Sequence, residues 1–302
     1  MIKIGRKGPK AAGLRVGECK ELEGPPAELL EELSEMGPLY ATARNVGGAM
    51  GKLVEAGSVL IDEESGFAMD PAAGWSLSLD EWIALHVAVM RNEGREVSSL
   101  EFDFRGQTLG LSMVEVPTVS RVGVLQEAAA RYPGQVKANL DLDVWRREIE
   151  PSVSMCGNCG AAAMRRARYP RQHPLFLILQ HAMQHELPLH CRLFGQHMDF
   201  RLELTPKQVT PMEGFVLASD ENGMDTLHID LKWVHAFVVG TTRIDGDEWG
   251  SIGIYDMHGN RNIEIATPDE EMVGEWRLIC DTAESFYRER KRPEGFGEQQ
   301  NL

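Results

Sequence analysis

Two cysteines and two histidines in the middle of the chain have the spacings that metal sites use. Cys156 and Cys159 are separated by two residues within the run Cys-Gly-Asn-Cys-Gly. The glycines let backbone amides turn toward two thiolates, an arrangement that suits a tetrahedral zinc ion. His181 and His185 lie four residues apart, so one face of a helix presents both imidazoles. Together the two pairs form a candidate zinc site.

A second interpretation of these residues stays open, because the spacing between the pairs differs from that of common zinc fingers. In it, Cys156 and Cys159 are a reduced pair in a tight, glycine-rich turn, and His181 and His185 lie on a helix surface. A redox pair is disfavoured, since no strand-to-helix context typical of thioredoxin-like proteins precedes the cysteines.

A group of arginines follows the cysteines, and their guanidinium groups are suited to binding carboxylates or phosphates. The group consists of Arg165, Arg166, Arg168 and Arg171. The alternative is that these side chains form the solvent-exposed face of a helix and bind nothing. The sequence shows no Ser-His-Asp order, phosphate-binding glycine loop or carboxylate pair that demands catalysis, so the catalytic residues are unknown.

The overall composition limits the classes of function. The chain has 302 residues, a hydrophobic fraction of 43%, a formal net charge of −15 and five cysteines. Nonspecific binding to nucleic acid or anionic membranes needs a basic field, which this charge disfavours. No apolar run approaches the ~20 residues that cross a bilayer, and the odd cysteine count suits a reducing compartment. We expect a cytoplasmic protein that binds neither nucleic acid nor membrane, and its oligomeric state stays unknown.

The elements that must position these residues follow a pattern that occurs twice, roughly 150 residues apart. Trp82 and Trp233 each precede an apolar run, a polar turn and a second strand-like run. A turn beginning near Phe102 in the first copy and Tyr255 in the second then ends at glycine. The run after Trp233 is rich in Val and Phe, which favours strands over buried helices.

This doubling predicts the organisation of the chain. Pro26 opens a first helix, and a strongly apolar helix runs from Pro174 to Glu186, whereas Lys207–Pro211 has the composition of a turn. The predicted segments are a flexible N-terminus (1–25), a first repeat (26–132), an inter-repeat helical insert with the cysteine pair (133–187), a second repeat (188–287) and a flexible tail (288–302).

The succession of segments resembles that of the HemS/ChuX-like haem-utilisation proteins, in particular their long, two-copy members. The resemblance spans about residues 25 to 285 and rests on order and spacing in both copies. The stretches that carry it are Leu29–Leu30 and Ala41–Asn45 in the first half, and Lys207–Pro211, Thr226–His228, Asp245–Gly246, Ser251–Gly259 and Trp276 in the second.

The resemblance implies an α+β fold of two similar halves, each with a large, mostly antiparallel β-sheet flanked by helices. It implies a cytoplasmic bacterial protein that serves haem and iron utilisation, either by carrying haem or by degrading it oxidatively. Haem or another small ligand would lie in a cleft between the repeats. In that family a His ligates the iron and an Arg stands on the other face. The matching positions here are Ser152 and Ser76, and serine supplies neither an iron ligand nor a basic group.

A haem site in this chain would therefore need other ligands than those of the family. The candidates for contact with haem are His173, His181 and His185, and Arg165 and Arg166 are available for its propionates. The alternative hypothesis is a binding or scaffold protein that keeps the fold without haem, with structural zinc in the insert.

Overall fold

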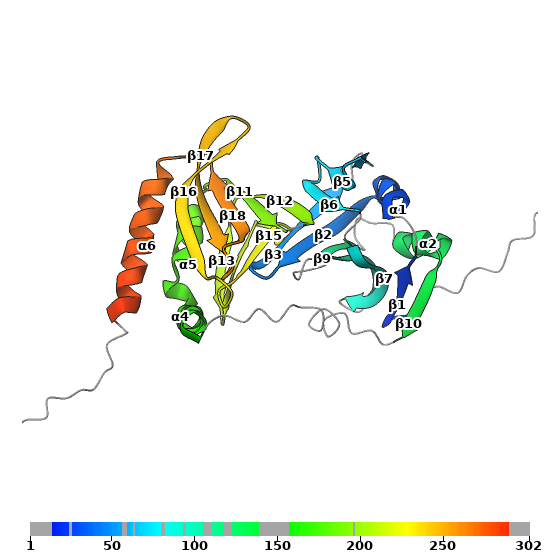
Figure 1. Cartoon of the computed structure of the whole chain (residues 1–302), viewed down its shortest axis with the longest axis horizontal. Coiled ribbons are helices and arrows are strands. Elements are labelled where there is room, and N and C mark those ends of the chain that lie inside the picture. The colour runs from blue at the N-terminus through cyan, green and yellow to red at the C-terminus, as the bar shows by residue number, and fades with distance from the viewer. Residues whose placement is uncertain are drawn as a thin grey trace, which may run out of the picture. The chain divides into compact units, whose positions relative to one another are not determined.

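Antiparallel strands and a few helices form two compact units (Figure 1). The computed structural model describes residues 14–23, 26–55, 59–62, 64–79, 82–92, 95–104, 110–116, 123–138, 157–195 and 197–289. Of these, the first unit takes those within Met1–Ala43, Leu53–Pro151 and Gln196–Met198, and the second those within Arg44–Lys52, Ser152–Gly195 and Asp199–Leu302.

Strands dominate the N-terminal half of the chain. Its elements are β1 (Glu18–Leu22), α1 (Pro26–Glu32), the 3-10 helix η1 (Leu33–Glu35), β2 (Pro38–Asn45), β3 (Gly48–Glu55), β4 (Leu60–Asp62), β5 (Phe67–Asp70), β6 (Trp75–Ser78), β7 (Trp82–Asn92), β8 (Arg95–Phe104), β9 (Gly110–Glu115), α2 (Val124–Arg131) and β10 (Gly134–Ala138). In the first unit the strand order is β10-β1-β7-β8-β9-β2 in one sheet and β6-β5-β4 in another. Strand β1 lies inside the segment expected to be flexible, where it pairs with β7 and β10.

A buried carboxylate joins a strand to a helix in the first unit. Glu115, at the end of β9, is 1% exposed. Its oxygens accept hydrogen bonds from the backbone N–H groups of Gly123 and Leu125, both at 3.0 Å. These groups belong to the first turn of α2, whose N–H groups have no partner within the helix. Glu115 therefore fixes where α2 begins.

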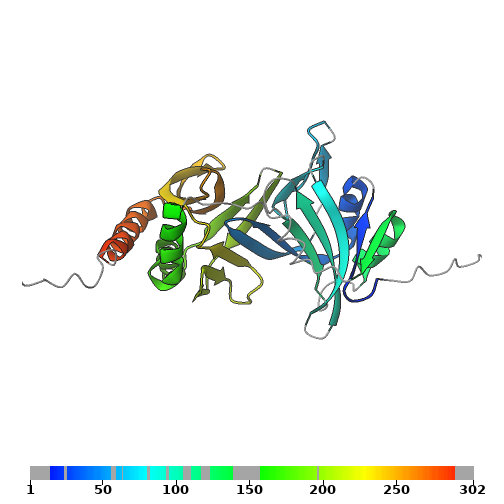
Figure 2. The same cartoon turned by 60° about the horizontal axis from the view of Figure 1, so that its bottom comes forward.

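The C-terminal half contains the longer helices. Its elements are α4 (Gly157–Arg168), the 3-10 helix η2 (Pro170–Gln172), α5 (Pro174–Gln184), β11 (Leu189–Phe194), β12 (Met198–Leu204), β13 (Gln208–Met212), β14 (Phe215–Ser219), β15 (Thr226–Asp230), β16 (Ala236–Ile244), β17 (Asp247–Tyr255), β18 (Arg261–Thr267) and α6 (Met272–Glu289). In the second unit the strand orders are β16-β17-β18-β11-β12 and β3-β15-β14-β13. Helix α5 packs against α6, β13 and β14 (Figure 2).

One face of the sheet β16-β17-β18-β11-β12 is the core face of the second unit. Helix α6 covers this face. The evidence is that a Cβ atom added to Gly250 of β17 would lie 3.3 Å from Cγ2 of Val273 in α6. Alternate residues of the strands share that face. Its fully or almost fully buried side chains include Cys191, Leu193, Phe200, Leu202, Ile252, Ile254, Ile263 and Ile265. The opposite face is consequently free to carry polar side chains.

The two halves repeat one order of elements, as the sequence predicted. Helix α1, strands β2 to β9 and helix α2 in the first half correspond in order to α5, β11 to β18 and α6 in the second. The strands expected after Trp82 and Trp233 are β7 and β16. The α+β fold with two large antiparallel sheets is therefore confirmed.

Two local predictions were wrong. The stretch Lys207–Pro211 is mostly strand β13 rather than a turn, and Pro211 fits there because β13 stands at the end of the strand order. The tight turn expected at Cys156–Gly160 is replaced from Gly157 onward by the first turn of α4.

The tip of the β2–β3 hairpin belongs to the second unit, and one side chain holds it. Nδ2 of the buried Asn45 donates to the carbonyl oxygens of Phe194 at 2.9 Å and Asn262 at 2.7 Å. Its Oδ1 accepts from the two N–H groups of Gly47–Gly48 at 2.9 and 3.1 Å. A Cβ atom on the second of these glycines would lie 2.0 Å from the carbonyl oxygen of His228, so only glycine fits.

We predict that Asn45→Ala lowers the free energy of unfolding by about 2–4 kcal/mol, because it leaves several buried backbone groups without partners. Urea unfolding followed by circular dichroism measures the change. The matched control is Asn222→Ala in an exposed turn, which should stay within about 0.5 kcal/mol of the natural protein. Equal effects of the two substitutions would show that Asn45 does not hold the hairpin.

Candidate functional site

The structure brings the predicted zinc ligands together only in part. Cys156 lies outside the described residues, and only the backbone of Cys159 is described, in α4. The rings of His181 and His185 are adjacent on α5, with centroids 4.3 Å apart, and Nε2 of His181 lies 3.3 Å from Oε2 of Glu275. Among the described residues, no group of three or more His, Cys, Asp or Glu side chains could hold a metal ion. The zinc site gains no support.

The predicted haem contacts are on the helical side of the second unit. His173 is 0% exposed, and its Nδ1 accepts a hydrogen bond of 3.2 Å from the backbone N–H of Leu175 at the start of α5. Its ring centroid is 6.1 Å from that of Phe237. His173 therefore serves as a buried helix cap, and its role as a haem ligand stays a prediction.

The remaining predicted positions are spread over the chain. Arg165 is exposed on α4, and Arg166 is described there only as backbone. Ser76 lies on β6, paired with Met69 of β5, and Ser152 is outside the described residues. The contacts of these positions with haem also stay predictions.

A different set of side chains converges on the face opposite the core of the sheet β16-β17-β18-β11-β12. On β11, His190, Arg192 and Phe194 alternate with buried apolar residues, so all three point away from the core. In register with them on β12 are Glu203, Arg201 and Asp199. Trp249 on β17 and Glu264 on β18 complete the set, which we call the polar face.

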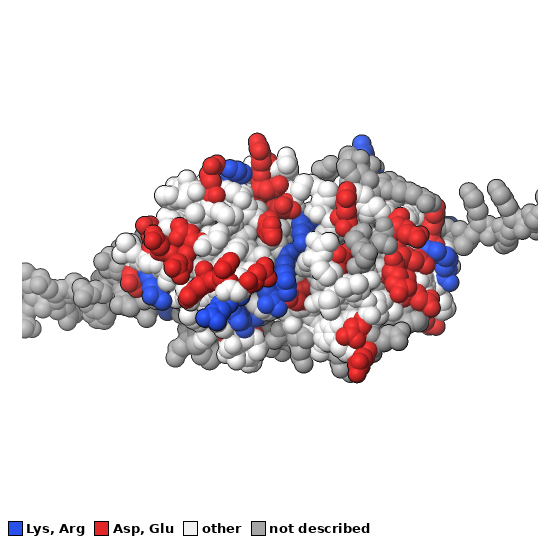
Figure 3. All heavy atoms as spheres, turned by 90° about the horizontal axis from the view of Figure 1, so that it is seen from above, with Lys and Arg blue, Asp and Glu red and all other residues white. Residues whose placement is uncertain are grey.

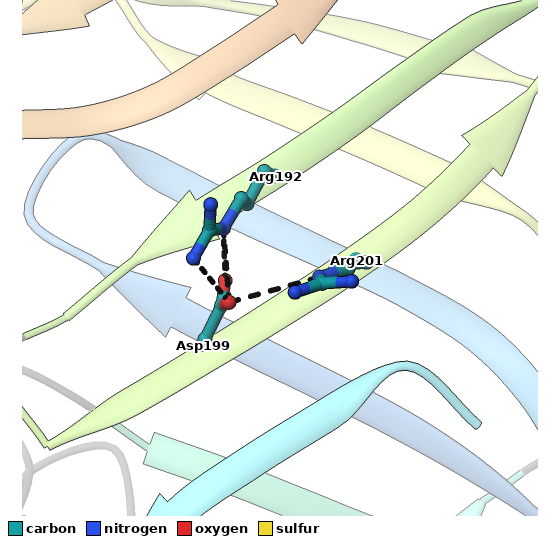
Figure 4. A network of polar contacts seen from close by, with 3 residues as sticks. All are labelled: Arg192, Asp199 and Arg201. Atoms are coloured by element: carbon teal, nitrogen blue, oxygen red, sulfur yellow. Dashed lines mark hydrogen bonds and ion pairs between the residues drawn. The ribbon is translucent and has the colours of Figure 1, made fainter. Parts of the chain in front are cut away.

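Two arginines share one carboxylate on the polar face (Figure 4). Nε of Arg192 donates to Oδ1 and Oδ2 of Asp199 at 2.8 and 2.9 Å, and Nη2 of Arg192 lies 2.6 Å from Oδ2. Nε of Arg201 lies 3.7 Å from the same oxygen. The Asp199 side chain is only 18% exposed, whereas that of Arg201 is 55% exposed. Asp199 thus occupies a site that is built for a carboxylate.

A phenylalanine ring lies beside this network, in contact with two cations. The guanidinium carbon of Arg192 is 4.5 Å from the ring centroid of Phe194, and that of Arg261 is 4.9 Å from it. Cations favour the electron-rich face of an aromatic ring at such distances. Arg261 is also held by Oε1 of Glu264 at 2.5 Å. The polar face therefore combines guanidinium groups with an aromatic ring that two of them cover.

His190 is a half-buried histidine on the same face. Burial lowers its pKa, and the charges of Arg201 and Arg192 act in the same direction, whereas Glu203 and Glu264 raise the pKa. The ring is therefore neutral at pH 7, with a nitrogen lone pair available. Its centroid lies 6.2 Å from that of Trp249, edge to face. Among the described residues, no hydrogen bond to either ring nitrogen is found.

Small residues lie between the large side chains of the polar face. Ala266 stands opposite His190 on β18, and Ser251 on β17 pairs with Ala266. The next residue of β17 on this face, Gly253, is covered by a ring, because a Cβ atom there would lie 2.8 Å from Cε2 of Tyr255. Ala266 and Ser251 are themselves buried, at 0% and 5% exposed.

The guanidinium groups are a local exception in an acidic protein. The formal net charge is −15, and Figure 3 shows Asp and Glu side chains spread over one surface, with Lys and Arg side chains in small groups. An arginine group in such a surface binds anions selectively through short-range contacts rather than through a broad positive field. The arrangement suits a flat, conjugated molecule with carboxylate groups.

Sequence reasoning missed most of this site. His190, Arg192 and Arg201 were not among the residues that the sequence selected. The only signal was their two-residue spacing along strand-like segments. The pairing of β11 with both β12 and β18, which only the structure gives, brings these residues together.

Comparison with known proteins places the fold. No protein-family model and no curated protein matches the sequence. Among solved structures, ChuS, a haem oxygenase of E. coli, matches with a TM-score of 0.61 and 14% identity over 88% of both chains. Haem-bound PhuS, a haem-binding protein of Pseudomonas aeruginosa, matches with a TM-score of 0.63 and 13% identity, over 88% of this chain and 86% of that one.

The chain thus has the fold of two-copy haem-utilisation proteins, as the resemblance of its repeats predicted. At such low identity, the likeness establishes the fold and leaves the site to be argued from the residues of this chain. In the part of the chain that is described, no helix has the length and apolar character to cross a bilayer.

The second unit contains another half-buried histidine, which gives stability a pH dependence. His228 on β15 packs edge to face on Phe215, with centroids 4.5 Å apart. Burial lowers the pKa of His228, and only the charge of Asp230 opposes this effect. The unfolded chain therefore takes up a proton at a higher pH than the folded chain does, starting near the ordinary histidine pKa of about 6.5.

We predict that stability falls as the pH drops below about 6.5, and that His228→Gln makes the fall smaller. Urea unfolding at several pH values between about 7.5 and 5 measures both. His258→Gln, in an exposed turn, is the control for the loss of one imidazole. If the natural protein and His228→Gln lose stability in parallel, His228 is not the group that titrates.

Proposed function

We propose that this protein binds haem on the polar face and serves haem utilisation in the cytoplasm. The observation that carries the proposal is the Arg192–Asp199–Arg201 network beside Phe194. The fold, which is similar to those of a haem oxygenase and a haem-binding protein, also supports the proposal. Haem combines a flat aromatic macrocycle with two propionates and an iron, and the polar face has a group for each.

The donor set fits each part of haem. Arg192 and Arg201 suit the propionates, because the guanidinium fork of an arginine matches a carboxylate in two parallel hydrogen bonds. Trp249, which is partly exposed, offers aromatic surface for the macrocycle. A neutral histidine is the commonest protein ligand of haem iron, and His190 supplies one. When bound, haem would bring an iron capable of redox change and of binding diatomic ligands.

Haem binding is better supported than haem degradation. Ser76 stands where the family has an arginine, and a serine hydroxyl cannot offer the cationic hydrogen-bond donor that this arginine would provide. The residues of the polar face can hold and orient an anionic ligand. We therefore propose a haem carrier, with the fold retained for binding.

We predict that hemin added to the protein produces a saturable Soret band. Arg192→Ala combined with Arg201→Ala should raise the dissociation constant about ten- to a hundredfold, the cost of losing one or two charge-assisted hydrogen bonds. The control is Arg243→Ala, an exposed arginine of β16. A Soret response no larger than that of an unrelated acidic protein would refute haem binding and favour a scaffold that keeps the fold.

We also predict that Asp199→Asn tightens hemin binding several-fold at low salt, because Asp199 competes with a ligand carboxylate for the guanidinium of Arg192. Hemin titration at two salt concentrations measures the effect. Asp247→Asn, at the exposed start of β17, removes the same charge elsewhere. Equal tightening by both variants would mean that overall charge, rather than the Arg192 site, governs affinity.

A further inference from the structure

A haem-binding face needs a ligand for the iron, and the resemblance matches the family's histidine to Ser152, whose hydroxyl is a poor iron ligand. Two histidines of the helical layer are engaged in structure. His173 caps α5 from a fully buried position, and His181 lies against Glu275 of α6. His228 belongs to the other sheet of the second unit, where it packs on Phe215.

His190 has the surroundings that these histidines lack. It projects from β11 onto the polar face, two residues before Arg192, so its imidazole and the arginine network lie on the same side of the sheet. Trp249 flanks the ring on one side. Ala266, its neighbour in register on β18, is small and fully buried, whereas the His190 side chain itself is partly exposed.

We infer that the His190 imidazole is the axial ligand of the haem iron in this protein, supplied by a strand of the sheet instead of by a helix. The inference rests on the haem binding proposed above. It places iron ligation and propionate binding on neighbouring residues of β11, at a spacing of two.

A carboxylate is placed to support the ligand. Glu203 stands opposite His190 in the β11–β12 register, and its charge acts on the ring. Histidines that ligate metals usually donate their second ring N–H to a carboxylate or carbonyl, which orients the ring. Glu203 is therefore the positioning residue that we expect for His190.

The test compares hemin complexes of the natural protein, His190→Ala, His190→Gln and the control His258→Ala, an exposed histidine of the same unit. We expect both His190 variants to shift the ferric Soret band, to change the electron paramagnetic resonance of the iron, and to weaken binding about tenfold or more. Added imidazole should restore the natural spectrum in His190→Ala but leave His258→Ala unchanged. Thermal melts of the free proteins show that the variants fold.

The outcomes separate this inference from the proposed function. A Soret band in the natural protein that is weakened by Arg192→Ala, yet identical in spectrum after His190→Ala, overturns the His190 ligand and keeps haem binding. Loss of the natural spectrum on replacing both His181 and His185 instead would assign the ligand to α5 and also overturn the inference. No hemin response in the natural protein removes both proposals together.

Discussion

The pairing of β11 with two neighbours is the constraint on which the second unit depends. Because β11 pairs with β18 on one side and β12 on the other, its register is fixed along its whole length. A slip of one residue would bring Arg192 into the apolar core and Cys191 out of it. Burial of Cys191, whose pKa rises to about 12, and of its apolar neighbours thus determines that His190 and Arg192 reach the opposite face.

The electrostatics of the polar face follow from this register. Arg192 and Arg201 stand opposite each other, and two like charges in one pair destabilise a sheet. Asp199, two residues before Arg201, relieves the repulsion by accepting from Arg192 and lying near Arg201. A carboxylate is therefore a requirement of the arrangement. A ligand carboxylate that replaced the Asp199 carboxylate beside Arg192 would leave the local charge almost unchanged. Exchange between the two carboxylates is therefore energetically accessible.

The sequence was sufficient for the fold but not for the site. Alternation and Val-rich runs predicted β7 and β16, and the repeated tryptophans predicted the doubling, because these signals are local. Strand β13 was missed because Pro211 normally argues against strands and is tolerated only at an edge, which local sequence does not show. The Arg192–Asp199–Arg201 network depends on pairing between strands, and composition and spacing alone do not specify such pairing.

The arginines and the histidine of the polar face come from neighbouring strands. Strands β11 and β12 present Arg192, Arg201 and His190 together on one face. A strand positions such groups more rigidly than a loop does, since both neighbours hold its backbone by hydrogen bonds. A ligand set moved onto the sheet would thus bind with little reorganisation of the protein. For the haem carrier that we propose, such rigidity favours tight, reversible binding over a reaction that needs a mobile distal group.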